Sequence, residues 1–168
     1  MQQELYIEIL RIIGFIVPMY AANSLAMLLG GGKPLDLNTK FIDGRPLFGR
    51  GKTIKGCIAG ILAGIIFGLF FYLIYPMQNY LLFVLSSSIG AIAGDIAGSF
   101  IKRRFGLKRG SPVPLLDQLD FVAGALIFGS SFMVPTIKEL AVIVVVTLVA
   151  HKLGNIIAFL FKIKKVPW

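Results

Sequence analysis

Residues 95–120 read D-I-A-G-S-F-I-K-R-R-F-G-L-K-R-G-S-P-V-P-L-L-D-Q-L-D. The segment begins with Asp95 inside one apolar run and ends with Asp117 and Asp120 at the start of the next. Between them the chain carries five cations: Lys102, Arg103, Arg104, Lys108 and Arg109. Three carboxylates facing several fixed cations between two apolar runs are typical of a membrane-surface site for Mg²⁺ and a polyphosphate.

Apolar residues dominate the composition. Of 168 residues, 57% are hydrophobic and only 15% are charged, against about 25% charged residues in an average soluble domain. These values predict an integral membrane protein. The net charge of +9 does not indicate a nucleic-acid partner, because the cations cluster beside apolar spans, where they report topology and phosphate chemistry. The single cysteine, Cys57, excludes an intrachain disulfide and a cysteine metal cluster.

Five apolar spans predict an all-α integral membrane protein with five transmembrane helices, two long cytoplasmic loops and a single domain over residues 1–168. The spans cover about residues 12–32, 58–75, 80–101, 121–136 and 140–161. At 1.5 Å per residue the second span is roughly 27 Å long, which is enough to cross a bilayer. In that span Gly60, Gly64 and Gly68 recur every four residues. This spacing predicts a close helix–helix contact and leaves a homodimer open.

Basic residues are distributed unevenly between the two ends of the spans. The two long loops and the C-terminal tail carry fourteen of the seventeen lysines and arginines, the tail contributing Lys162, Lys164 and Lys165. The short turns at the other end carry only Lys138. Because positive charge stays in the cytoplasm, we predict a multi-pass protein of the cell membrane with its N-terminus outside and its C-terminus and both long loops cytoplasmic.

Three carboxylates are the candidate metal ligands. Asp95 shares a helix face with Ser99 and Lys102 and lies about two turns into the membrane, where a carboxylate is a functional candidate by default. The alternative is a structural ion pair, for instance with Lys152. Asp117 and Asp120 are three residues apart and lie on one face of a helix N-terminus, whose dipole stabilises negative charge. Capping explains one of the two aspartates, and a metal shared with Asp95 explains both.

The first long loop is the candidate phosphate-binding segment. It ends F-G-R-G-K-T-I-K-G at residues 48–56 and opens directly into a helix. Glycines allow backbone N–H groups to approach phosphate, and a helix N-terminus attracts anions. Pro46 stands where a P-loop requires glycine, so the segment is not a P-loop. The alternative is a flexible loop whose lysines only report topology.

The remaining polar residues of the spans have open roles. In the first span, Glu8 and Arg11 are expected to form an ion pair on one helix face. Asn23 forms either an interhelical hydrogen bond or part of a substrate cavity. His151, Lys152 and Asn155 interrupt the fifth span, where cavity lining and interhelical bonding are both open.

The chain offers no Ser-His-Asp set and no other general base with a nucleophile. Metal ligands and cations without these groups favour a phosphoryl-type transfer in which the attacking group is already anionic. The alternative to an enzyme is a small polytopic transporter or channel with Asp95, His151 and Lys152 as an intramembrane path.

Two segments together resemble a known family. S-F-I-K-R-R-F-G-L-K (99–108) followed by L-D-Q-L-D (116–120) resembles the signature of membrane CTP-dependent phosphatidate cytidylyltransferases. Arg109 and Gln118 depart from that signature, and its His-Gly-Gly is absent. The first loop, D-G-R-P-L-F-G-R-G-K-T-I-K-G (43–56), the chain length and the D-Q-L-D are similar to the shorter archaeal CDP-archaeol synthases. The residues that match the signature position for position are Ser99, Lys102, Arg103, Lys108, Asp117 and Asp120.

The resemblance implies a Mg²⁺-dependent transfer of CMP from CTP to 2,3-di-O-geranylgeranylglyceryl phosphate, giving CDP-archaeol and pyrophosphate. On this reading Asp95, Asp117 and Asp120 hold the metal and are catalytic together with Lys102. The lipid lies along the first span near Asn23. The expected CTP-binding residues are Asp43, Gly44, Gly51, Lys52, Thr53, Ser99, Arg103 and Lys108.

Overall fold

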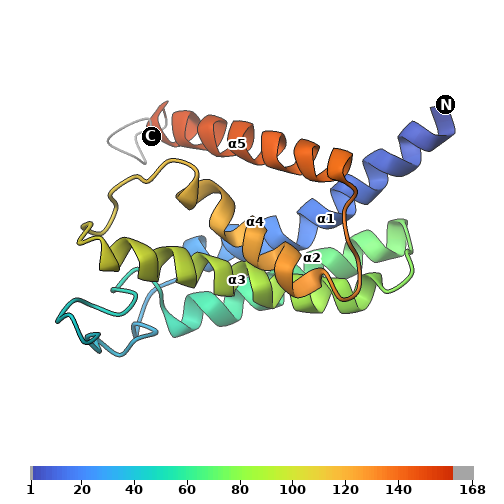
Figure 1. The fold of residues 1–168 in the computed structure, drawn as a ribbon. Coiled ribbons are helices and arrows are strands. Elements are labelled where there is room, and N and C mark those ends of the chain that lie inside the picture. The colour runs from blue at the N-terminus through green and yellow to red at the C-terminus, as the bar shows by residue number, and fades with distance from the viewer. Residues whose placement is uncertain (1, 161–168) are drawn as a thin grey trace.

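The structure is a bundle of five α-helices whose two long loops lie together at one end (Figure 1). It is a computed structural model that describes residues 2–160, with no description of the side chains at positions 155 and 158. The helices are α1 (Gln2–Leu28), α2 (Ile54–Ile74), α3 (Tyr80–Arg104), α4 (Leu116–Gly129) and α5 (Ile137–Leu160). The predicted all-α fold is confirmed for the described residues.

Three of these helices, α1, α2 and α3, have the length and the apolar composition that a membrane crossing requires. Helix α4 has 14 residues and is therefore only about 21 Å long at 1.5 Å per residue. Large apolar side chains remain exposed on the outer faces of the long helices, among them Phe70 and Leu73 of α2. Such faces suit lipid chains rather than water.

Glycines set the close packing of α2 on its neighbours. A Cβ atom added at Gly60 would lie 2.6 Å from the carbonyl oxygen of Ala22 in α1, and one at Gly64 would lie 2.8 Å from that of Pro18. At Gly68 the added atom would collide with Val84 of α3. The close contact predicted from the four-residue spacing is confirmed. The glycine face of α2 packs against α1 and α3 of the same chain.

A second glycine stripe joins α3 to α4. A Cβ atom at Gly90 would meet the backbone of Gly124, and one at Gly94 would fall on the backbone carbonyl of Asp120. Gly98, one turn further on, lies against the carboxylate of Asp120. The glycines of this stripe, Gly90, Gly94 and Gly98, have the same four-residue spacing as those of α2. This stripe places the start of α4 directly on the polar end of α3.

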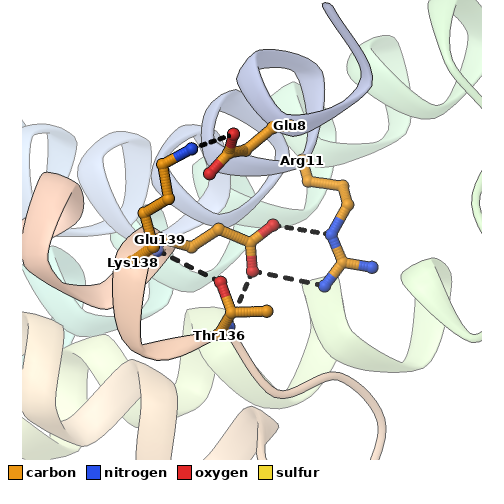
Figure 2. A network of polar contacts seen from close by, with 5 residues as sticks. All are labelled: Glu8, Arg11, Thr136, Lys138 and Glu139. Atoms are coloured by element: carbon orange, nitrogen blue, oxygen red, sulfur yellow. Dashed lines mark hydrogen bonds and ion pairs between the residues drawn. The ribbon is translucent and has the colours of Figure 1, made fainter. Parts of the chain in front are cut away.

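The predicted ion pair between Glu8 and Arg11 is wrong (Figure 2). Arg11 instead donates from Nε to Oε1 of Glu139 at 2.7 Å, and Glu8 accepts from Nζ of Lys138 at 2.6 Å. The physical reason is Glu139, which is only 2% exposed at the start of α5 and needs a cation as a partner. Thr136 and Glu139 also exchange side-chain and backbone hydrogen bonds in a capping box. These contacts attach α5 to α1 at the end of the bundle away from the long loops.

The loops and the ends of the helices are divided between the two ends of the bundle. Both long loops and the C-terminal end of α5 lie at one end of the bundle, and the N-terminal end of α1 lies at the other (Figure 1). The tail lysines Lys162, Lys164 and Lys165 lie outside the described residues.

Candidate functional site

An ion pair between the first loop and α3 forms one side of the candidate site. Nζ of Lys52 binds Oδ2 of Asp95, across 43 positions of sequence, and the two side chains are 23% and 21% exposed. The partner of Asp95 is thus Lys52 rather than Lys152, the alternative considered from the sequence. The pair brings the loop that precedes α2 onto the polar end of α3.

A second ion pair joins the end of α3 to the start of α4. Lys102, in the last turn of α3, donates from Nζ to Oδ1 of Asp117 at 2.6 Å. The other carboxylate oxygen of Asp117 accepts the backbone N–H of Val113 at 3.0 Å. The aspartate therefore orders the segment that leads into α4 as well as neutralising Lys102.

The third carboxylate, Asp120, lies at the crossing of α3 and α4. Its side chain lies against Gly98, and its Oδ1 accepts the backbone N–H of Phe121 at 2.7 Å. Asp95, Asp117 and Lys52 are all near enough to act on Asp120 electrostatically. The three predicted carboxylates are thus gathered at one place, although no three Asp, Glu, His or Cys side chains among residues 2–160 converge on a single metal position.

The first loop is closed by a buried aspartate that the sequence reasoning missed. Asp36 is 6% exposed. Its Oδ1 accepts the N–H of Asn38 at 3.0 Å, and its Oδ2 accepts those of Phe48 at 3.0 Å and Gly49 at 2.8 Å. Burial raises the pKa of Asp36, but the three N–H donors outweigh burial and hold the pKa below its ordinary value of 3.8. The only signal in the sequence was an aspartate two residues after Pro34, in a loop that also contains glycines.

The first loop contacts Arg104, the last residue of α3. The guanidinium of Arg104 binds Oδ1 of Asp43 and the carbonyl oxygen of Pro46, and it lies 4.7 Å from the centroid of the Phe41 ring. Burial raises the pKa of Asp43, yet the N–H of Arg45 and the charge of Arg104 bring it below its ordinary value. This contact holds the predicted Asp43 segment against the end of α3.

Two arginines, Arg103 in the last turn of α3 and Arg109 in the second loop, face glycines of the first loop. Arg103 lies 3.7 Å from where a Cβ atom would stand on Gly49, and Arg109 lies 3.5 Å from the same position on Gly51. Arg103 donates to the carbonyl oxygen of Lys108 at 3.4 Å, while its buried Nε has no acceptor among the described residues. These are ordinary van der Waals distances, so the first loop packs directly against the two arginines at Gly49 and Gly51.

The remaining predicted residues divide between the site and the helices. Thr53 is the N-cap of α2: its Oγ1 accepts the N–H groups of Gly31 and Gly56, each at 3.1 Å. Ser99 is buried on α3 one turn after Asp95, and Gly44 has a φ of 75° in the turn beside Asp43. Asn23 is half-buried in α1 and is not among the residues that meet at the ion pairs.

These features define a class: an all-helical bundle with three carboxylates and their cations gathered where two basic loops meet the helix ends. Comparison with known proteins then gives the family. The CDP-archaeol synthase family matches residues 5–168, and the chain belongs to it.

The chain matches individual relatives over nearly their full length. The chain is 50% identical over 161 residues to a CDP-archaeol synthase of Methanothermobacter thermautotrophicus, covering 95% of this chain and 94% of that protein. It is 44% identical over 164 residues to that of Aeropyrum pernix, covering 96% and 93%. A solved structure described as an intramembrane enzyme for archaeal membrane lipid biosynthesis superposes with a TM-score of 0.81 at 39% identity, covering 86% of this chain and 92% of that one. The predicted resemblance and the membrane class are confirmed.

Proposed function

We propose that this chain transfers CMP from CTP to the phosphate of an archaeal unsaturated ether lipid, 2,3-di-O-geranylgeranylglyceryl phosphate, and releases pyrophosphate. The observation that carries this proposal is the meeting of Asp95, Asp117 and Asp120 with Lys52 and Lys102 between the two basic loops. Family membership supports an enzyme over the transporter or channel.

The donor set suits the Mg²⁺ that the family reaction implies. Carboxylate oxygens are the hard ligands that Mg²⁺ prefers, and Asp95, Asp117 and Asp120 would hold it once Asp95 and Asp117 had parted from Lys52 and Lys102. Bound there, Mg²⁺ would neutralise charge on the triphosphate and on the departing pyrophosphate.

The two ion pairs suggest how the substrate enters. Lys52 and Lys102 each neutralise one of the candidate metal ligands. In the proposed complex the ammonium groups turn to phosphate oxygens, which frees Asp95 and Asp117. CTP and Mg²⁺ therefore bind cooperatively. CTP binds the lysine of each ion pair and leaves the aspartate for Mg²⁺, and Mg²⁺ binds the aspartate and leaves the lysine for CTP.

The chemical step requires no general base from the protein. An anionic oxygen of the lipid phosphate attacks the α-phosphorus of CTP. The new P–O bond forms there, the bond to the oxygen that bridges to the β-phosphorus breaks, and its electron pair leaves with pyrophosphate. Lys102, Arg103 and the segment with Gly51 and Lys52, which lies just before α2, orient the phosphates and offset their charge.

In the membrane, all five helices cross the bilayer in this proposal, and the site faces the cytoplasm. This orientation is supported by the uneven distribution of basic residues, because both basic loops lie at one end of the bundle. The lipid chains lie between helices along α1 near Asn23. Labelling of single cysteines with a membrane-impermeant reagent, in a variant lacking Cys57, tests this orientation: a cysteine at Asn38 should react only after the membrane is opened.

The direct test is pyrophosphate release by the purified protein in detergent with CTP, Mg²⁺ and the geranylgeranyl ether-lipid phosphate. Release should require all three components, and it should fail with ATP in place of CTP or with a chelator. If folded protein neither releases pyrophosphate nor binds CTP, the proposed function is wrong.

The role of the carboxylates is tested by Asp120→Asn, which should lower the rate at least about a hundredfold, as does the loss of other preorganised charged groups. Glu8→Gln is the matched control, because it makes the same chemical change at the opposite end of the bundle. A folded Asp120→Asn protein within a few-fold of the wild-type rate would remove Asp120 from the site.

A further inference from the structure

A groove lies on the outer side of α2, where α1 gives way to the first loop. It has a volume of about 550 Å³. No site carboxylate lines it, and apart from two lysines its residues are apolar. The lining residues are Gly31, Gly32, Lys33, Ile54, Lys55, Ile58, Ala59 and Leu62.

The backbone after α1 forms one wall of this groove. Gly31 and Gly32 have φ values of 128° and 75°, which only glycine adopts readily, and nothing lies within 4 Å of the place where either would carry a Cβ atom. The chain then crosses the start of α2, where the carbonyl oxygen of Lys33 accepts the N–H of Ile54 at 3.2 Å. The two glycines thus bend the chain and keep the groove free of side chains.

The other wall is an apolar stripe on α2. Ile54, Ile58 and Leu62 are four residues apart, so they lie on one face of the helix, and they are 38%, 55% and 53% exposed. Gly60 and Gly64 lie on the packed side of α2, against α1 and α3. In a helix that crosses the membrane, an exposed apolar stripe of this kind faces lipid chains.

Cations stand at the loop end of the stripe. Lys33 and Lys55 are exposed and form no ion pair within residues 2–160, whereas Lys52, in the same loop, is neutralised by Asp95. Two unpaired ammonium groups at the loop end of an apolar groove are complementary to a molecule with an anionic head and a long apolar chain.

We propose that this groove binds one anionic phospholipid of the surrounding bilayer. Its phosphate lies between Lys33 and Lys55, and one of its chains lies along Ile54, Ile58 and Leu62. The site needs neither CTP nor metal, so the proposal does not depend on the proposed function. A lysine near an anionic lipid surface strengthens binding by about fivefold, and the two lysines therefore distinguish an anionic from a zwitterionic lipid with identical chains.

The test is native mass spectrometry of the protein taken from mixed micelles that contain dioleoylphosphatidylglycerol and dioleoylphosphatidylcholine in equal amounts. The wild type should retain one phosphatidylglycerol molecule in preference to phosphatidylcholine by fivefold or more. Lys33→Gln with Lys55→Gln should reduce the preference below twofold. The matched control, Lys40→Gln with Arg50→Gln, removes the same charge from the same loop outside the groove lining and should keep the preference.

A further variant tests the contribution of the lipid's apolar chain separately from that of its head group. Ala59→Phe fills the groove on the exposed side of α2 without changing charge, and it should reduce retained phosphatidylglycerol at least threefold. Equal retention of both lipids by the wild type would overturn the proposal, as would an unchanged preference in the Lys33 and Lys55 variant or loss of preference in the control. Full retention by Ala59→Phe would show that the lysines act without the groove, which also overturns it.

Discussion

Replacing Asp36 by asparagine should open the first loop while leaving the helices folded. Asp36 is buried and accepts three backbone N–H groups, one on Oδ1 and two on Oδ2. Asparagine has one acceptor oxygen, so in either orientation of its amide at least one N–H group faces an amino group. The side chain also loses its charge, so the remaining bonds become weaker.

The size of the effect follows from this count. A hydrogen bond to a charged group contributes about 1.5–3 kcal/mol, so the variant should lose at least about 2 kcal/mol of loop stability. At about 1.4 kcal/mol per factor of ten, protection of the loop amides from hydrogen exchange falls roughly thirtyfold. Lys52 is affected too, because its carbonyl oxygen accepts the N–H of Leu35, the neighbour of Asp36, at 2.8 Å. The KM for CTP should therefore rise.

The assay is hydrogen exchange followed by mass spectrometry on peptides that cover residues 37–49, with peptides of α3 as the internal reference. Lys40→Gln is the control, since it changes one exposed charge in the same loop. If loop protection changes less than threefold, or if α3 loses protection to the same degree as the loop, the reasoning that Asp36 closes the loop is refuted.

The pH dependence of the same loop gives a second prediction. The pKa of Asp36 is lower in the folded loop than its ordinary value of 3.8. Its contribution to stability is therefore complete above that ordinary value and is lost as the pH falls through the lowered pKa. Exchange protection of Phe48 and Gly49, corrected for intrinsic exchange, should follow this course in the wild type. In Asp36→Asn it should be independent of pH, and a wild-type loss of protection near neutral pH would contradict the prediction.

Two further predictions concern the bundle itself and use thermal unfolding in detergent. Gly64→Ala places a methyl group 2.8 Å from the backbone of α1 and should destabilise the protein by about 1–3 kcal/mol. Gly154→Ala meets open space and should stabilise α5 by roughly 0.5–1 kcal/mol. Equal unfolding midpoints for the two variants would contradict the packing of α2 on α1. Arg11→Met leaves the buried Glu139 without its cation and should cost roughly 3 kcal/mol of stability. Lys138→Met breaks an exposed ion pair and should cost at most about 1 kcal/mol. A larger loss in Lys138→Met than in Arg11→Met would refute the assignment of Arg11 as the partner of the buried Glu139.

Much of the architecture was predictable because helices form from local contacts. Apolar spans of helical length and the turns between them are properties of consecutive residues, and the hydrogen bonds of a helix join residues only four apart. The same locality placed Asp117 and Asp120 on one helix face. The four-residue glycine spacing predicted the close packing of α2, and used in the same way on Gly90, Gly94 and Gly98 it would have predicted the crossing of α3 and α4.

Only the tertiary structure decided which charged residues form ion pairs with one another. Glu8 and Arg11 are suitably spaced to pair, yet both bind residues about 130 positions away, because the buried Glu139 at the start of α5 needs a cation. Asp36 in the sequence is one polar residue of a polar loop, and only the folded loop brings its three N–H donors to it.

The sequence by itself thus determined the class of protein, the all-α fold and the candidate residues, since these depend on composition, periodicity and motif. The tertiary structure decided that Lys52 neutralises Asp95, that Lys102 neutralises Asp117, and that Asp120 lies against Gly94 and Gly98 of α3. Ion pairs and cavities depend on the conformation of long loops and on where helices cross. Those are set by contacts between distant residues, and no local pattern in the chain records them.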